Sequence, residues 1–187
     1  IEPNSIINLP DDIYVEGGDV IVCNKYVFIG YSNNNTLIKY KVSRTSQNVL
    51  RYLSNLIPHK KIIGFELIKS DDDPYNNCLH LDCCFQPFGV GHVILCPEAF
   101  KNLHDVKLIQ SIFGEEYIIN ISRNEMYDMY SNIFSISNNV IISEKKFIRL
   151  NNILTAKGYV VEEVNFSEIS KMGGLLRCST LPLSRIL

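Results

Sequence analysis

The sequence has no long apolar run and no cluster of basic residues. No run approaches the roughly 20 apolar residues of a membrane-spanning helix, so no membrane segment is expected. The longest basic runs are pairs such as Lys60-Lys61, and the net charge is -2, so nucleic acid is not an expected partner. The opening residues, Ile1-Glu2-Pro3-Asn4, do not form a signal peptide.

The cysteines also lack a familiar spacing. No C-x-x-C pair is present, which excludes the zinc-ribbon and thioredoxin patterns. A chain of 187 residues can bury a sizeable core without disulfides. We therefore expect reduced thiols, a cytoplasmic location, and no metal or other cofactor. The six cysteines are at positions 23, 78, 83, 84, 96 and 178.

What is present is an ordinary globular composition, 46% hydrophobic and 20% charged. The length is normal for one domain, so residues 1–187 are expected to form a single domain. The chain does not begin with Met, and it starts close to the motif Glu16-Gly17-Gly18-Asp19. We therefore expect the numbering to open partway into a longer protein.

The order strand, turn, strand, helix, strand recurs three times, in units of roughly 50–60 residues typical of a repeated architecture. In the first unit, Ser43 is expected to cap a helix that Pro58 ends. Pro97 is expected to begin a short helix in the second, and Gly158 to end a helix over 144–157 in the third. Strands are predicted at 20–22, 26–29, 62–68, 78–85, 92–96, 117–121, 132–136, 140–142 and 159–164, and 174–183 would open another unit.

Glu16-Gly17-Gly18-Asp19 precedes a predicted strand. Its two glycines permit backbone conformations closed to other residues and let a ligand approach closely. Two carboxylates flank them. This segment is therefore a candidate ligand site, and a solvated turn before a strand is the alternative.

The segment 78–85 places polar side chains along a predicted strand. Alternation would bring His80 and Asp82 to one face, roughly 6.6 Å apart, so both could reach one small ligand. A core histidine is the alternative, although buried carboxylates are rare without partners. A metal site is disfavoured, because one strand cannot present four ligands tetrahedrally. The expected polar face is Cys78, His80, Asp82 and Cys84, and the opposite face is Leu79, Leu81, Cys83 and Phe85.

Cys178 lies in a glycine-led segment that begins at Gly173-Gly174. Such a cysteine is a candidate nucleophile, and a small buried hydrophobe is the alternative. The segment 132–136 is interpreted as a core strand with a polar first residue.

Together and in this order, these segments resemble the guanidino-group-modifying (pentein) superfamily. That group includes arginine and agmatine deiminases, dimethylarginine dimethylaminohydrolases and glycine amidinotransferases. A further family segment spans 28–32, and its usual Arg-Thr pair arrives late, as Arg44-Thr45, so 33–42 is interpreted as an insertion. The matching elements are Glu16-Gly-Gly-Asp19, His80-Leu-Asp82, Asn132-Ile-Phe-Ser and Gly173-Gly174-x-x-x-Cys178-x-Thr180.

The resemblance implies an α/β fold, a pseudo-symmetric α/β propeller of five ββαβ units. About three of the five fit this chain, as the C-terminal part of a longer propeller forming one catalytic domain. The family's first part, which contributes another substrate-holding carboxylate, has no counterpart here.

The resemblance also implies roles. Cys178 would attack the guanidinium carbon and form a covalent thiouronium intermediate. His80 would act as acid and base, oriented by Glu16, while Asp82 and Asp19 would bind the substrate. Glu16, His80 and Cys178 are expected to converge on one cavity, with Asp82 facing the same space.

Hydrolysis of a small guanidino substrate is the favoured reaction. An amidinotransferase, a non-catalytic module that binds arginine-like ligands, and a cysteine-protease-like hydrolase are the alternatives. Homo-oligomer formation is left open.

Overall fold

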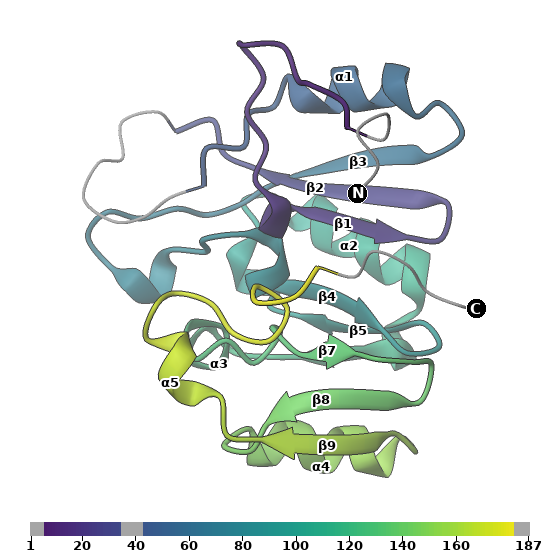
Figure 1. Cartoon of the computed structure of the whole chain (residues 1–187), viewed down its shortest axis with the longest axis vertical. Coiled ribbons are helices and arrows are strands. Elements are labelled where there is room, and N and C mark those ends of the chain that lie inside the picture. The colour runs from purple at the N-terminus through teal and green to yellow at the C-terminus, as the bar shows by residue number, and fades with distance from the viewer. Residues whose placement is uncertain (1–5, 35–42, 182–187) are drawn as a thin grey trace.

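The computed structural model describes residues 6–34 and 43–181. Within them the chain forms three small sheets of three strands, with sheet orders β1-β2-β3, β4-β5-β6 and β7-β8-β9. In each sheet an antiparallel hairpin is followed by a helix and a parallel third strand. The predicted ββαβ repeat is thereby confirmed, with the three sheets arranged along the long axis of the molecule (Figure 1).

The bounds follow the sequence pattern closely in the first hairpin, whereas the first strand of the second hairpin begins later than predicted and that of the third is shorter. Asn24 adopts a left-handed φ of 50° in the β1–β2 turn, as a tight hairpin requires. Gly158, with a φ of 89°, lies just beyond the helix of the third unit, as predicted. The elements are β1 (Val20–Cys23), β2 (Tyr26–Tyr31), α1 (Val49–Leu56), β3 (Lys61–Glu66), β4 (Phe85–Phe88), β5 (His92–Leu95), α2 (Leu103–Phe113), β6 (Ile118–Asn120), α3 (Arg123–Tyr127), β7 (Phe134–Ser135), β8 (Val140–Glu144), α4 (Ile148–Ala156), β9 (Val160–Val164) and α5 (Ser167–Ser170).

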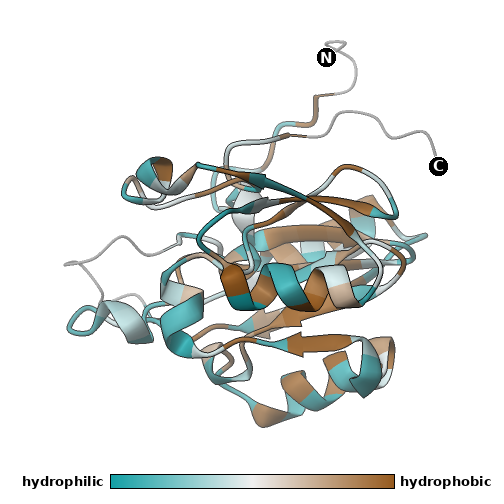
Figure 2. Ribbon diagram, turned by 90° about the horizontal axis from the view of Figure 1, so that it is seen from below, coloured by the Kyte–Doolittle hydropathy of each residue, from teal (hydrophilic) through white to brown (hydrophobic). Residues whose placement is uncertain are grey.

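Aromatic packing joins the first two units. Phe28 of β2 meets Phe85 of β4 edge to face, with ring centroids 5.1 Å apart, and stacks on Phe65 of β3 at 5.7 Å. All three rings are fully buried. Truncating one such buried ring to alanine costs about 3–5 kcal/mol, so these aromatic contacts contribute strongly to holding the first two units together. Figure 2 shows hydrophobic residues concentrated along the strands, while the helices alternate hydrophobic and hydrophilic positions.

The predicted strand over 78–85 is wrong. Residues Leu81–Cys83 form a 3₁₀ helix, and the strand begins only at Phe85. The N–H of Leu81 donates to the carboxylate of Asp19 at 2.9 Å, and the N–H of Cys83 donates to the carbonyl of His80 at 3.1 Å. Because these two donors are already satisfied, they cannot contribute to a strand ladder.

The predicted opening strand over 174–183 is also wrong as far as residue 181. The segment turns instead, with the N–H of Ser179 donating to Leu175 and that of Thr180 to Arg177. Positions 182 and 183 lie outside the described residues, as does most of the interpreted insertion. The described part of the predicted strand, residues 174–181, returns from α5 to the middle of the molecule, near β4 (Figure 1).

Further differences concern helices, including α5, which was not predicted. Asn48, not Ser43, precedes α1. Pro97 does begin a short 3₁₀ helix, but α2 follows it and was not predicted. The helix α3 was missed although Ser122 and Glu125 form a capping box, which the sequence carries as S-x-x-E. In the part of the chain that the structure describes, no helix has the length and apolar character to cross a bilayer.

Candidate active site

A cavity of about 980 Å³ lies where the three units meet. Gly17 and Gly18 border it from the first unit, and Phe134 and Ser135 border it from β7 of the third. His80, Asp82 and Cys178 all line it. Of the side chains predicted to converge, His80, Asp82 and Cys178 therefore face one space, and Glu16 reaches it through its contact with His80. Their catalytic roles stay predictions.

Glu16 and His80 form the most direct pair in this site. Glu16 Oε2 lies 2.7 Å from His80 Nε2, and Arg44 Nε donates to the other Glu16 oxygen at 2.8 Å. Burial tends to raise the pKa of Glu16, but the hydrogen bonds from His80 and Arg44 leave it below its ordinary value. Glu16 is thus anionic at neutral pH and can orient the His80 ring through this contact.

The close approach of His80 depends on a missing side chain. A Cβ built on Gly18 would lie 2.8 Å from Cγ and Nδ1 of the His80 ring. At Gly17, by contrast, a Cβ would meet nothing within 4 Å. Gly18 is therefore needed for packing against the histidine, and this packing explains why a glycine stands at this position of the motif.

Asp19 is fully buried and faces protein donors. Its Oδ2 accepts hydrogen bonds from the hydroxyls of Ser43 and Thr45, the latter at 2.6 Å. Its Oδ1 accepts the Leu81 N–H at 2.9 Å. Asp19 thereby ties the first unit to the turn that carries His80. This geometry favours a positioning role for Asp19 over the predicted contact with substrate.

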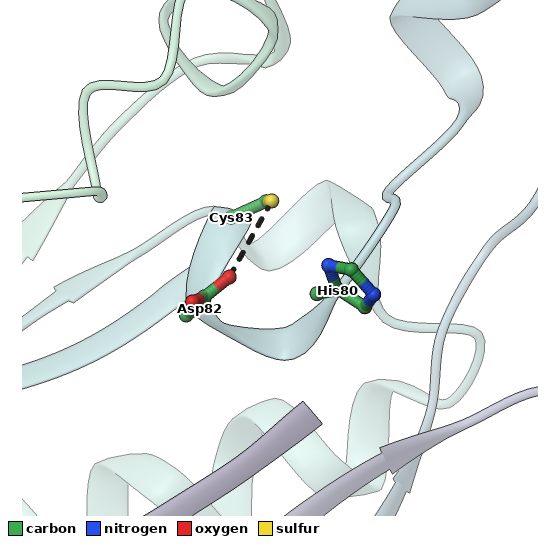
Figure 3. Close-up of side chains that lie close together, drawn as sticks. All are labelled: His80, Asp82 and Cys83. Atoms are coloured by element: carbon green, nitrogen blue, oxygen red, sulfur yellow. Dashed lines mark hydrogen bonds between the residues drawn. The ribbon is translucent and has the colours of Figure 1, made fainter. Parts of the chain in front are cut away.

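Asp82 is the carboxylate that lines the cavity, although it is only 3% exposed. Burial raises its pKa to about 6, against the opposing effect of the nearby charges of His80 and Arg177. The Cys83 thiol donates to Asp82 Oδ1 at 3.6 Å (Figure 3). At neutral pH the cavity therefore holds a poorly solvated carboxylate, which is a strong partner for a cation.

Cys178 is exposed and lies beside this carboxylate. Its Sγ is 3.7 Å and 3.9 Å from the two Asp82 oxygens, and Asn132 Nδ2 donates to it at 3.1 Å. Although the residue as a whole is exposed, its sulfur is partly buried, and this desolvation and then Asp82 raise the pKa of the thiol. Without a cationic ligand, the sulfur is therefore held mainly as the thiol at neutral pH.

His80, Asp82 and Cys83 also lie close enough to be considered as metal ligands (Figure 3). One potential ligand atom from each lies within 4.8 Å of the others. However, Nε2 of His80 already contacts Glu16, and burial raises the pKa of Cys83 well above its ordinary value. Both features weaken this set as a metal site.

Cys78 and Cys84, which the sequence offered as further metal ligands beside His80 and Asp82, point elsewhere. Cys78 Sγ donates to the carbonyl of His80 at 3.2 Å, and Cys84 Sγ to that of Leu81 at 3.4 Å. Because both contact backbone oxygens, they do not complete the cluster.

Sequence reasoning missed several residues of the site. Asn132 was interpreted as the polar start of a core strand, yet its amide contacts the Cys178 turn. Arg177 lines the cavity next to Cys178, and Arg44 holds Glu16. Two signals were available: Asn132 and Arg44 both lie in the family segments, and a polar residue such as Asn132 in an apolar segment requires a partner.

Comparison with known proteins gives one family match over nearly the whole chain. The family described as N,N dimethylarginine dimethylhydrolase, eukaryotic, matches residues 5–185. The chain is 28% identical over 175 residues to the uncharacterized protein YkgA of Bacillus subtilis, covering 93% of this chain and 54% of that protein. It is 26% identical over 180 residues to the bifunctional arginine dihydrolase/ornithine cyclodeaminase AgrE of Nostoc sp., covering 95% of this chain and 23% of that protein. The chain thus spans about half the length of YkgA and less of AgrE.

Solved structures share the fold. The N-terminal domain of ArgZ, a cyanobacterial arginine dihydrolase bound to its product, superposes with a TM-score of 0.77 at 24% identity, over 94% of this chain and 59% of that one. A dimethylarginine dimethylaminohydrolase adduct superposes with a TM-score of 0.69 at 20% identity, over 94% and 60%. The three units therefore correspond to a little over half of each of these two matched chains.

Proposed function

Because the chain belongs to the dimethylarginine dimethylhydrolase family of the pentein superfamily, we propose that it is a cysteine-dependent hydrolase of guanidino compounds. The substrate would be an arginine-like molecule, attacked at its guanidinium carbon. The observation that carries the proposal is the pairing of an exposed thiol, Cys178, with a buried carboxylate, Asp82, at 3.7 Å in one cavity.

Asp82 supplies the binding energy for the cation. A guanidinium is planar and can donate two parallel hydrogen bonds to one carboxylate. Because Asp82 is almost fully buried, its charge is weakly screened by water. A guanidinium paired with Asp82 would bring its carbon close to the Cys178 sulfur, which contacts the same carboxylate.

The bound cation also activates the nucleophile. Burial and Asp82 raise the pKa of Cys178, so the empty site disfavours the thiolate. A guanidinium neutralises the Asp82 charge and adds a positive charge beside the sulfur, so the thiol releases its proton to solvent and the thiolate becomes favoured when substrate binds. The thiolate then attacks the guanidinium carbon and forms an S–C bond, giving a tetrahedral adduct.

His80 is suited to the proton transfers. Paired with anionic Glu16, its imidazolium can donate a proton to the departing amine, which leaves a thiouronium on Cys178. The neutral imidazole can then take a proton from an attacking water. Collapse of the second tetrahedral adduct breaks the S–C bond, releases the ureido product and restores the thiol.

The proposal is tested with the whole chain and its Cys178→Ser variant. Each is incubated with arginine, N-methylated arginines and agmatine, and ureido product and released amine are quantified. The expected result is turnover by the wild type and a loss of several orders of magnitude in the serine variant. Equal turnover by both proteins would exclude covalent catalysis by Cys178.

A guanidinium-binding module is the second candidate, favoured by the raised pKa of Cys178. Binding of these compounds by calorimetry without turnover would support it. Amidino transfer is recognised in the same assay, because product would then require an added amine acceptor such as glycine.

A further inference from the structure

Asn132 lies at the centre of the turn that presents Cys178. It is fully buried, just before β7. Its Oδ1 accepts hydrogen bonds from the N–H groups of Leu175 at 3.2 Å and Cys178 at 3.1 Å, and its backbone carbonyl accepts from Arg177 at 3.3 Å. One residue of the third unit thus binds three backbone donors of the turn.

The same side chain contacts the sulfur through its other end. Asn132 Nδ2 donates to Cys178 Sγ at 3.1 Å. The other side-chain hydrogen-bond contacts described for this sulfur are the Asp82 oxygens at 3.7 Å and 3.9 Å, and an ionised carboxylate can only accept. Asn132 therefore provides a donor on one side of the sulfur, while Asp82 provides negative charge on another.

Resting on the proposed function, we propose that Asn132 is a positioning residue for the nucleophile. Its carboxamide oxygen fixes the backbone turn that carries Cys178, and its NH₂ group stabilises the thiolate. The assignment concerns how the sulfur is held and charged, so it applies before any substrate is bound.

The charges around the sulfur explain why such a donor is needed. Burial and then Asp82 raise the pKa of Cys178, whereas the Leu175 N–H and the Asn132 amide lower it. The sulfur also interacts electrostatically with the buried Cys83 thiol. His80 and Arg177 line the same cavity. Arg177 is a cation, and His80 is one when it is protonated. Removing the amide donor would remove one of the two hydrogen bonds that lower the pKa of Cys178, while Asp82 would still raise it.

Asn132→Asp separates the two functions of the side chain. Aspartate has nearly the same shape and keeps an oxygen that can accept from the Leu175 and Cys178 N–H groups. It replaces the NH₂ donor with a second acceptor, so the contact with sulfur becomes repulsive. A purely structural role predicts little change in thiol reactivity in this variant, whereas thiolate stabilisation predicts a clear loss.

The matched control is Asn138→Asp. Asn138 is exposed and borders the same cavity, so it introduces the same charge change near the site without the described contact to Cys178. Alkylation by neutral iodoacetamide is followed by mass spectrometry of the Cys178 peptide across a range of pH. In this reaction the thiolate displaces iodide and an S–C bond forms, so the rate reports the thiolate fraction.

We expect Asn132→Asp to alkylate about tenfold more slowly at neutral pH, with its pH profile displaced upward by about one unit, because one unit changes the thiolate fraction tenfold. Asn138→Asp is expected to stay within about twofold of wild type at neutral pH. Circular dichroism melting checks that each variant is folded. If Asn132→Asp does not fold, the neutral Asn132→Ser takes its place and should also shift the profile upward.

Superimposable profiles for wild type and the Asn132 variant would overturn the assignment, as would an equal shift in the Asn138 control. Alkylation requires no guanidino substrate, so this test stands apart from the proposed function. A wild type that turns over no guanidino compound but shows the Asn132 effect would refute only the hydrolase proposal.

Discussion

Glu16 and His80 are 64 residues apart in the chain, and their side chains meet at 2.7 Å between Oε2 and Nε2. The first unit supplies the carboxylate, and the turn that leads into the second unit supplies the imidazole. The carboxylate and the imidazole thus come from different units, so their alignment depends on how the two units pack.

Glu16→Gln tests the charge in this pair. Glutamine can still accept a hydrogen bond from His80 Nε2, but it no longer supports an imidazolium electrostatically. We expect kcat to fall about 10- to 100-fold, less than for His80→Ala, which removes the acid–base group altogether. Steady-state kinetics of the two variants across pH measures the difference. A glutamine variant as impaired as His80→Ala would contradict a purely orienting role.

Gly18→Ala tests the packing against the histidine. The added Cβ would lie 2.8 Å from the ring, so His80 must move and its contact with Glu16 must lengthen. We expect a loss of activity on the order of 100-fold, because small misplacements of catalytic groups are costly. Gly17→Ala is the matched control, since its Cβ meets nothing within 4 Å. Similar kinetics for the two alanine variants would show that the predicted clash is relieved elsewhere.

Asp82→Asn is expected to stabilise the fold while abolishing turnover. The folded-state pKa of Asp82, about 6, lies above its ordinary value of 3.8. The folded protein therefore holds this proton more tightly than the unfolded chain, and its stability falls as pH rises through this range. Asparagine is neutral at every pH, so it should add on the order of 2 kcal/mol at pH 7.5 and only about 0.5 kcal/mol at pH 4.

Thermal melts at the two pH values measure this gain. Asp128→Asn, at an exposed position, is the control and should leave the melting temperature nearly unchanged. A destabilised Asp82→Asn at pH 7.5 would mean that the hydrogen bonds of this carboxylate outweigh its burial penalty.

Asp19→Asn should act on stability first. The buried carboxylate accepts from Ser43, Thr45 and Leu81, and asparagine replaces one of its acceptor oxygens with a donor. We expect a loss of about 1–3 kcal/mol in the free energy of unfolding, measured by urea denaturation. Asp11→Asn, on an exposed residue, should change it by less than about 0.5 kcal/mol. Full activity in the folded Asp19→Asn protein would argue against both substrate contact and a need for this carboxylate in positioning.

The strands and hairpins were largely predictable because their apolar periodicity is local. The 3₁₀ helix at Leu81–Cys83 was not, since its geometry depends on the carboxylate of Asp19, 62 residues away. The turn around Cys178 likewise depends on the amide of Asn132, 46 residues earlier. The local pattern predicts a strand in both segments. In the structure, Asp19 accepts the N–H of Leu81 and Asn132 accepts that of Cys178, so these donors cannot join a strand ladder.

For the site, the residues Glu16, His80, Asp82 and Cys178 could be selected in advance because they match ordered family motifs. Their separate tasks could not be assigned from residue type alone. Asp19 and Asp82 are chemically identical, yet one faces three protein donors and the other lines the cavity. Only the surroundings distinguish the two carboxylates.

The placement of Cys178 also has a consequence for the order of events in folding. Its turn is bound by Asn132 of the third unit and lies against Asp82 at the start of the second. The sulfur therefore reaches its environment only after these two units have docked. During refolding, the alkylation rate of Cys178 should fall to its native value later than the circular dichroism signal of the individual helices forms, so this rate would report when the two units dock.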